Sequence, residues 1–570
     1  MSTIPVKNNY DVIVIGAGVG GLTAALALSR SGLSVCVVEM ASVPGGYLAG
    51  FHRSRFRFDT AIHWLNQCNE GGIMHTVFET FGTDYPKVVI QKRIRRIVGK
   101  SYDYLLTDNP DELKQQWQKE FPHEKEGIER FFNDAKKMGL NMKNYGTSVR
   151  STDTMNFFEK AKNVLKVLKF IVPFVKHVRF TGRDGVKKGL ERYFKDQNLL
   201  NIFSSEPDML SCLVPIGWAY VHDFQSPPTG GGQAFPEWMI YLLKYFGGEI
   251  YYHCKVEKIL LNEANEAVGV KINHRGIQYE VKSDMVIAAC DVETLYEKML
   301  PENLVPKELK DNLRKAPLYS SSVTISVALD CSPDKLGFNE EMIHIAREDK
   351  SGSDKASSDP HISEIILLSP SFRDPAMAPE GSGTITIFMP ALMEHHNNWE
   401  AKQDENGDYI RGDEYVKLKN EIAEVLIKRV EDRLAPGLRK HILFYDVATP
   451  VTHQRYTGNK GGTMMGARPG KENVQAKIAH YKTPIKNLIL SGHWAELGGG
   501  VPIAVKSGIN AALIVMQEKA PKAFEVYRAY FNNKISAAEV RKSAVLKPYD
   551  DSWKRKLTPA EMLAERRKES

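Results

Sequence analysis

The chain of 570 residues has few cysteines, and they are widely spread. No CxxC pair and no Cys/His cluster at metal-ligand spacing occurs, which argues against a disulfide framework and against a structural zinc site. We therefore predict free thiols in a reducing compartment and no bound metal. The six cysteines are Cys36, Cys68, Cys212, Cys254, Cys290 and Cys331.

Long apolar runs and a strong charge imbalance are also missing. No stretch of about 18 consecutive apolar residues is present, so we do not expect a membrane-spanning helix. The N-terminus lacks a charged region followed by a long apolar one, which disfavours a secretory signal and favours the cytoplasmic side. The 76 Lys and Arg against 69 Asp and Glu leave a net charge of only +7, so no nucleic-acid partner is predicted.

A strand, a glycine-rich turn and a helix follow one another near the start. Residues 10–15 (YDVIVI) form a short apolar run typical of a buried parallel strand. The next residues, GAGVGG, have the GxGxxG spacing and lead into a small-residue helix that ends at Gly32. Gly16 permits the tight turn, Gly18 lets the backbone approach a pyrophosphate, and Gly21 lets the helix pack against the strand.

A second strand, LSVCVVE, ends in Glu39, whose carboxylate is placed to accept the ribose hydroxyls of an adenosine. An acidic residue at this position disfavours a 2′-phosphate. Together these features predict a dinucleotide site, with a phosphate-free βαβ turn as the alternative. They do not distinguish FAD from NAD.

A second glycine pair, Gly45-Gly46, follows the acidic strand and precedes a basic and aromatic stretch that reaches Phe58-Asp59. Adjacent glycines suit close approach of the backbone to a phosphate or a flavin edge. Here the sequence resembles the FAD-containing amine oxidase and phytoene desaturase superfamily. The pattern is most similar to its carotenoid desaturase, carotenoid isomerase and retinol saturase branch. The resemblance implies an α/β fold with a two-dinucleotide-binding (glutathione-reductase-like) FAD domain and an interrupted α+β substrate domain.

Residues 487–515 repeat the order of strand, glycine-rich turn and small-residue helix. The resemblance implies that Gly492 and the turn 498–501 lie against the flavin, with a helix from Ile503 pointing its positive end at the ring. Many members of the superfamily have an Asp where this chain has His493, which puts the usual ribityl contact in doubt. A second flavin motif so far along the chain favours FAD over NAD.

The residues expected to contact the cofactor come from both ends of the chain and from a strand meander within 229–300. His63 is a candidate proton carrier, with a packed structural histidine as the alternative. NAD(P)H or a quinone is a candidate redox partner. The expected FAD contacts are Gly16, Gly18, Gly20, Gly21, Glu39, Met40, Gly45, Gly46, Val256, Gly492, His493, Gly500 and Val501.

The resemblance implies an FAD-dependent oxidoreductase acting on C–C or C=C bonds of a long isoprenoid or carotenoid. Desaturation, saturation and cis-trans isomerisation remain open. The alternatives are a flavin amine oxidase and a non-catalytic lipid-binding protein in which FAD has only a structural role. The expected FAD domain comprises 1–100, 225–300 and 450–520, the substrate domain 101–224 and 301–449, and a helical appendage 521–570.

Segment 157–180 suggests a membrane contact. A helix there carries lysines on one stripe, while apolar residues fill much of the remaining surface. Such a helix suits an anionic membrane surface, and a substrate-domain helix with its lysines in water is the alternative. We therefore expect a peripheral membrane protein with a hydrophobic small-molecule substrate, and the sequence leaves the oligomeric state open. The lysines are Lys162, Lys166, Lys169 and Lys176, and the apolar residues are Val164, Leu165, Leu168, Ile171 and Val175.

Overall fold

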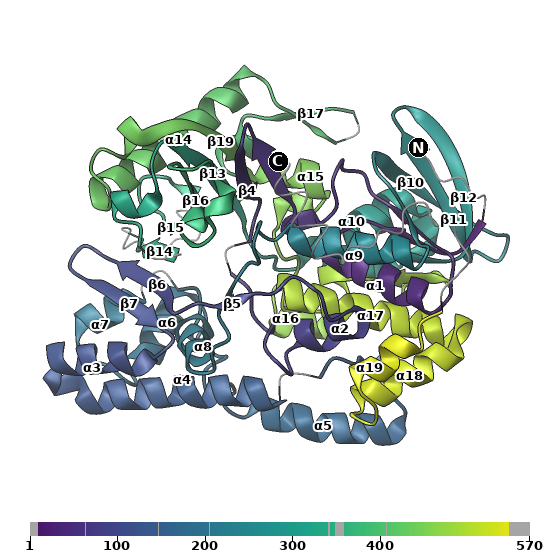
Figure 1. Ribbon diagram of the computed structural model, residues 1–570, viewed down its shortest axis with the longest axis horizontal. Coiled ribbons are helices and arrows are strands. Elements are labelled where there is room, and N and C mark those ends of the chain that lie inside the picture. Colours follow the sequence, from purple (N-terminus) through teal and green to yellow (C-terminus); the bar gives the residue numbers. More distant parts are fainter. Residues whose placement is uncertain are drawn as a thin grey trace.

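The structure is a computed structural model of mixed α/β architecture with two seven-stranded sheets (Figure 1). One sheet carries the expected glycine turns, and helices separate it from a second sheet and a helical cluster. The residues described are 9–62, 64–145, 148–203, 206–339, 342–347, 358–405 and 407–545. His63, the candidate proton carrier, and the end of the tail from residue 546 lie outside these ranges.

The first sheet combines five parallel strands with an antiparallel meander. β1 lies between β2 and β12, and β12 also pairs with β20, so both ends of the chain meet in one sheet. The predicted strands at 10–15 and before Glu39 are confirmed. The strands are β1 (Asn9–Ile15), β2 (Val35–Val38), β9 (Glu249–Tyr251), β10 (Cys254–Leu261), β11 (Ala267–His274), β12 (Ile277–Ala288) and β20 (Leu488–Leu490).

Three helices are buried around this sheet: α1 (Val19–Arg30), α9 (Ala234–Tyr245) and α17 (Gly500–Lys519). Every residue of α1 is buried, and α1 packs against both α9 and α17 (Figure 1). Within the described chain, α17 alone is long and apolar enough to cross a membrane, and 67% of its apolar window is buried. Burial of that kind is typical of a core helix.

The second sheet has the order β19-β13-β16-β15-β14-β6-β7. Helix α14 (Asp413–Arg433) packs on it through Ile422, Leu426 and Val430. β6 precedes residue 100 in the chain but pairs with β14 of this sheet. The strands are β6 (Arg93–Val98), β7 (Asp103–Thr107), β13 (Ser321–Leu329), β14 (Met342–Ile345), β15 (Ile365–Leu368), β16 (Gly383–Ala391) and β19 (Ile442–Ala448).

A helical cluster packs around Trp117, Phe131 and Phe132, next to β6 and β7. Helix α5 (Phe157–Ile171) lies along its outside, beside the C-terminal helices (Figure 1). The remaining longer elements are α2 (Ile73–Phe81), α3 (Pro110–Glu120), α4 (Lys125–Tyr145), α6 (Gly182–Leu190), α7 (Gln197–Ile202), α8 (Met209–Tyr220), α11 (Lys307–Lys315), α15 (Pro450–Thr457), α18 (Pro521–Phe531), α19 (Ala537–Lys542), β3 (Gly50–Arg53) and β4 (Phe56–Asp59).

Candidate functional site

The carboxyl ends of the parallel strands meet at one edge of the first sheet. β1 ends before Gly16, β2 before Glu39, and β12 before Ala289. β20 ends two residues before Gly492. In open α/β sheets, ligands bind in the crevice outside these ends, so the topology gathers the predicted residues where a ligand would lie.

The three glycines of the first turn have different surroundings. Gly16 has a φ of +98°, and a Cβ built on it would lie 2.7 Å from the carbonyl oxygen of Ala289. A Cβ on Gly21 would collide with the carbonyl oxygen of Gly16. Gly18, by contrast, has an ordinary φ of −64° and no atom within 4 Å of its Cβ position. The fold itself therefore requires Gly16 and Gly21, whereas the open space at Gly18 is available to a ligand.

The Glu39 carboxylate is held beside this turn. It accepts hydrogen bonds from the backbone N–H of Ala17 (2.6 Å) and of Ala41 (2.8 Å). Burial raises the pKa of Glu39, although these two hydrogen bonds act in the opposite direction. The carbonyl of Glu39 accepts from the N–H of Cys254, which brings the start of β10 alongside. Val256 lies two residues further on that strand and is buried.

The second glycine pair lies directly against the first turn. The N–H of Gly45 donates to the carbonyl of Ala17 (2.8 Å), and Gly45 forms a β-bridge with Gly18. Gly45 and Gly46 have φ values of +119° and +57°, a backbone region that strongly favours glycine. A Cβ on Gly46 would lie 3.4 Å from the Cα of Gly18, so the two motifs form one continuous glycine surface.

The C-terminal motif closes the same crevice. A Cβ on Gly20 of α1 would lie 2.8 Å from the Cα of Gly492, while Gly492 itself has no atom within 4 Å of its Cβ position. Gly498, Gly499 and Gly500 all have positive φ and lead into α17. The structure therefore brings the two glycine motifs together, and the starts of α1 and α17 lie close to each other.

Two residues that support this arrangement were not predicted from the sequence as site residues. Gly508 of α17 faces α1, and a Cβ there would collide with the carbonyl oxygen of Gly20. Ala289 forms the wall behind Gly16. Gly508 stands in a run of small residues inside an apolar helix, and an interior helical glycine of this kind can signal close helix packing. Ala289 carries no signal of its own.

His493 lies in the C-terminal turn and is held neutral. Burial lowers its pKa to about 4. Its Nε2 atom is buried and has no hydrogen-bond partner among the described residues. Buried polar atoms normally have a partner, so this nitrogen fits a hydrogen bond to a bound ligand. Met40 reaches toward Gly458, Val501 lies partly buried in the first turn of α17, and Lys506 pairs with Glu496 at 3.0 Å.

A pocket lies between the segment that follows β4 and the second sheet. It is lined by Asp59, Thr60 and Ile62 after β4 and by Leu368, Arg373 and Thr386 from the second-sheet side. The Asp59 carboxylate accepts a hydrogen bond from the N–H of Gly232 at 2.8 Å. The Phe58-Asp59 motif thus lies between the glycine crevice and the second sheet.

Comparison with known proteins places this geometry among flavoproteins. The sequence profile described as "Flavin containing amine oxidoreductase" matches residues 19–516. The chain is 27% identical over 543 residues to prolycopene isomerase 2 of an Oncidium hybrid cultivar, covering 90% of this chain and 85% of that protein. It is 24% identical to an all-trans-retinol 13,14-reductase of Danio rerio (87% and 84%). It is 23% identical to a lycopene-forming phytoene desaturase of Pseudescherichia vulneris (89% and 99%).

Solved structures support the fold. An oxidoreductase from Methanosarcina mazei superposes with a TM-score of 0.54 at 16% identity, covering 89% of this chain and 100% of the other. A putrescine oxidase with bound putrescine also superposes with a TM-score of 0.54, at 13% identity, covering 90% and 99%. At these identities the similarity shows that the mixed α/β fold is shared.

Proposed function

The chain belongs to the flavin containing amine oxidoreductase family, and we propose that it acts on C–C or C=C bonds of a long isoprenoid or carotenoid. The relatives described above are named for isomerisation, reduction and desaturation of such molecules, which supports this substrate class over amines. The protein is an FAD-dependent oxidoreductase. Desaturation, saturation and cis-trans isomerisation remain the three forms that the reaction can take.

One observation carries the cofactor assignment: Gly18 and Gly492 both face open space where the starts of α1 and α17 meet. A helix N-terminus is a ready-made anion site, and α1 would hold the pyrophosphate of FAD there. Glu39 would accept the ribose hydroxyls, while Met40 and Val256 would lie at the adenosine. The Gly45-Gly46 pair would follow the phosphates, and His493 Nε2, Gly500 and Val501 would meet the flavin end.

The arrangement supports a two-dinucleotide-binding FAD domain built from the first sheet with α1, α9 and α17. The second sheet and the helical cluster would form the substrate domain, which the chain enters at β6. A bound FAD would supply the hydride-exchange chemistry that C–C and C=C bonds require. The chain's own residues would hold the cofactor, and burial keeps His493 neutral.

Desaturation would leave the flavin reduced and saturation would leave it oxidised, so we propose a quinone or NAD(P)H, respectively, as the partner that restores it. Isomerisation has no net redox change and would not consume such a partner. A substrate that resides in a bilayer also requires access from the membrane. We therefore propose that the protein works as a peripheral membrane protein on the cytoplasmic side.

An anaerobic flavin titration tests the reaction class. The oxidised holoenzyme is mixed with a polyene or with a primary amine, and the visible flavin spectrum is recorded. A desaturase would bleach with its polyene, and a saturase would reoxidise when pre-reduced enzyme meets the polyene. An isomerase would convert the polyene, as seen by chromatography, without net bleaching. Bleaching by the amine alone would overturn the isoprenoid assignment.

The cofactor site is tested separately by Gly18→Val. The new side chain enters open space at an ordinary backbone conformation, so the apoprotein should keep its thermal stability while flavin affinity falls at least about tenfold. Gly470→Val, also in open space but far along the chain, is the matched control and should bind flavin normally. Unchanged flavin affinity in Gly18→Val would show that the pyrophosphate does not bind at this turn.

A further inference from the structure

Residues 157–178, called here the α5 face, present an unusual number of apolar side chains to solvent. They provide 10 of the 22 large apolar side chains that are exposed in the described part of the chain. No residue of α5 is buried, and Phe157 and Phe158 are 80% and 82% exposed. Exposed apolar patches of this kind mark interaction surfaces. The ten are Phe157, Phe158, Val164, Leu165, Val167, Leu168, Ile171, Val172, Val175 and Val178.

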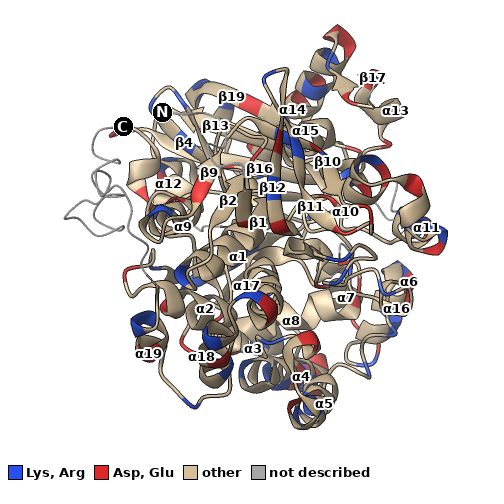
Figure 2. Ribbon diagram, turned by 90° about the vertical axis from the view of Figure 1, so that its right-hand side faces the viewer, with Lys and Arg blue, Asp and Glu red and all other residues tan. Residues whose placement is uncertain are grey.

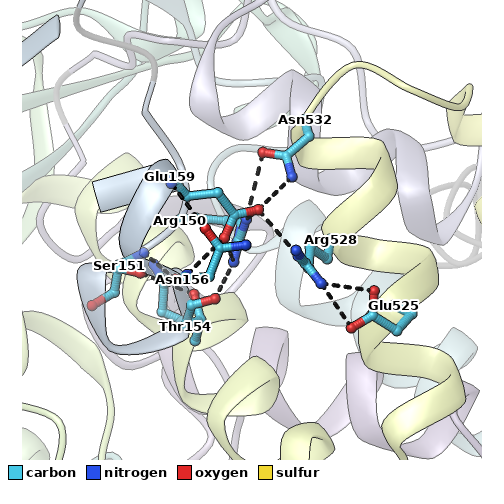
Figure 3. A network of polar contacts seen from close by, with 9 residues as sticks. Arg150, Ser151, Thr154, Asn156, Glu159, Glu525, Arg528 and Asn532 are labelled. Atoms are coloured by element: carbon cyan, nitrogen blue, oxygen red, sulfur yellow. Dashed lines mark hydrogen bonds and ion pairs between the residues drawn. The ribbon is translucent and has the colours of Figure 1, made fainter. Parts of the chain in front are cut away.

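The start of the α5 face is fixed to the body of the protein by the Glu159 carboxylate (Figure 3). The guanidinium of Arg150, whose side chain is 3% exposed, forms an ion pair with this carboxylate at 3.0 Å, and that of Arg528 in α18 forms another at 3.1 Å. Asn532 donates a further hydrogen bond at 2.8 Å. Burial acts to raise the pKa of Glu159, but the bonds from Arg150 and its other partners hold it well below its usual range. Glu159 also completes a capping box with Asn156.

The far end of the α5 face is fixed as well. Phe174 packs on the core of the helical cluster, and His177 is 1% exposed and stacks on Tyr193 with ring centroids 6.4 Å apart. In the middle, Asn141 of α4 donates to the carbonyl of Lys169 at 3.1 Å. The apolar side chains between these attachments are therefore held outward. Both views place α5 at the lower edge of the molecule (Figures 1 and 2).

The charges of the α5 face have one sign. Between residues 157 and 180 the sequence has six Lys and Arg and one acidic residue, Glu159, which already pairs with two arginines. Among the described residues, Lys160, Lys162 and Lys169 form no ion pair, and all three are exposed. Basic side chains flanking an apolar stripe match an anionic lipid surface. A second copy of the chain would instead bring like charges together.

We propose that the α5 face docks on the surface of an anionic lipid bilayer. Helix α5 has 15 residues, too few to span a bilayer, so it would lie in the interface plane. The Asn510 side chain of α17 accepts a hydrogen bond from the N–H of Ser151 (2.6 Å) and donates one to the carbonyl of Val149 (2.7 Å). The loop that precedes α5 is therefore attached to the cofactor half of the molecule, meaning the first sheet with α1, α9 and α17. Docking would thus hold the cofactor half at one orientation to the membrane.

The test is flotation of the FAD-loaded full chain with two kinds of vesicle. One contains phosphatidylcholine alone, and the other also contains about 30 mol% of the anionic lipid phosphatidylglycerol. We expect strong binding only to the anionic vesicles. Leu165→Glu with Leu168→Glu should lower binding at least about tenfold. Replacing Lys162, Lys166 and Lys169 by Gln should lower it roughly fivefold per lysine. Val416→Glu, at an exposed apolar residue of α14, is the matched control and should bind as the unaltered chain does.

Flavin content and melting temperature are recorded for each variant, because all the changed side chains lie at the surface and should leave both unaltered. No flotation of the unaltered chain with anionic vesicles would overturn the proposal. Equal binding by the double Glu variant would also overturn it. Suppose that the unaltered chain does not bind lipid, and that light scattering shows it to be a dimer while the double Glu variant is a monomer. The α5 face is then a contact between two copies of the chain. These readouts do not depend on catalysis, so they succeed or fail independently of the proposed reaction.

Discussion

Helices α17 and α5 are both rich in apolar residues, yet they lie in opposite environments. α17 has the length and composition of a membrane span, but 67% of its apolar window is buried in the protein. α5 is shorter and has no buried residue at all. Overall apolarity therefore does not distinguish a core helix from a surface-seeking one in this chain.

The difference follows from which other residues accompany the apolar ones. α17 includes Gly508 at its contact with Gly20, so the two backbones approach closely and cover each other. α5 has lysines at 160, 162, 166 and 169, and burying them without partners would cost several kcal/mol each. Small residues allow α17 to be enclosed, whereas the lysines keep α5 at the surface.

The largest expected effect is at the enclosed pair of helices. In Gly20→Val the new side chain would meet the Cα of Gly492 at 2.8 Å and the carbonyl oxygen of Ala504 at 3.1 Å. We expect a loss of about 3 kcal/mol in the free energy of unfolding, together with loss of bound flavin. Urea denaturation and the flavin-to-protein absorbance ratio measure both. A stability equal to that of the Gly470→Val control would show that α1 and α17 are not tightly apposed.

The next effect concerns the attachment of α5. Glu159→Gln removes the negative charge that balances the buried Arg150, and we expect the free energy of unfolding to fall by about 2 kcal/mol. The matched control is Glu525→Gln, because Glu525 also pairs with Arg528 but is 61% exposed. Chemical denaturation compares the two. If both substitutions have the same small effect, the carboxylate of Glu159 does not anchor the helix.

A smaller effect should appear as pH dependence. The pKa of His493 is lowered to about 4 by burial, against an ordinary value of 6.5, so the unfolded chain binds the proton more readily. The stability that comes from keeping His493 neutral is therefore present above pH 6.5 and is lost as the pH falls toward 4. In apoprotein melts between pH 7.5 and 4.5, His493→Asn should show a shallower decline than the unaltered chain. Parallel curves would contradict the buried, neutral histidine.

The smallest effect should come from the α5 face itself. Leu168 is 57% exposed, so Leu168→Ser should change the free energy of unfolding by less than about 0.5 kcal/mol in the absence of lipid. Leu426→Ser is the contrasting variant, because Leu426 of α14 is fully buried, and it should cost at least about 2 kcal/mol. Thermal melts of the two variants measure the difference in stability. A large loss in Leu168→Ser would mean that α5 is covered in solution.

The local motifs were predictable because their geometry depends on neighbours in the chain. The strand before Gly16, the helix after it and the strand before Glu39 form as expected, since the apolar runs and glycines that specify them are contiguous. The pairing of β6 with β14 was not predictable, because the strands are about 250 residues apart and no local pattern encodes their register. Ala289 behind Gly16 was missed for the same reason.

By itself, the sequence determined that the chain carries two glycine motifs of flavin type and one basic, apolar helix, because residue type and spacing are sufficient for these. Only the tertiary structure decided which glycines the fold requires and which face open space, as Gly16 and Gly18 show. It also decided that α17 is enclosed and α5 exposed. Burial is a property of the neighbours that surround a residue, and those neighbours are brought together only by folding.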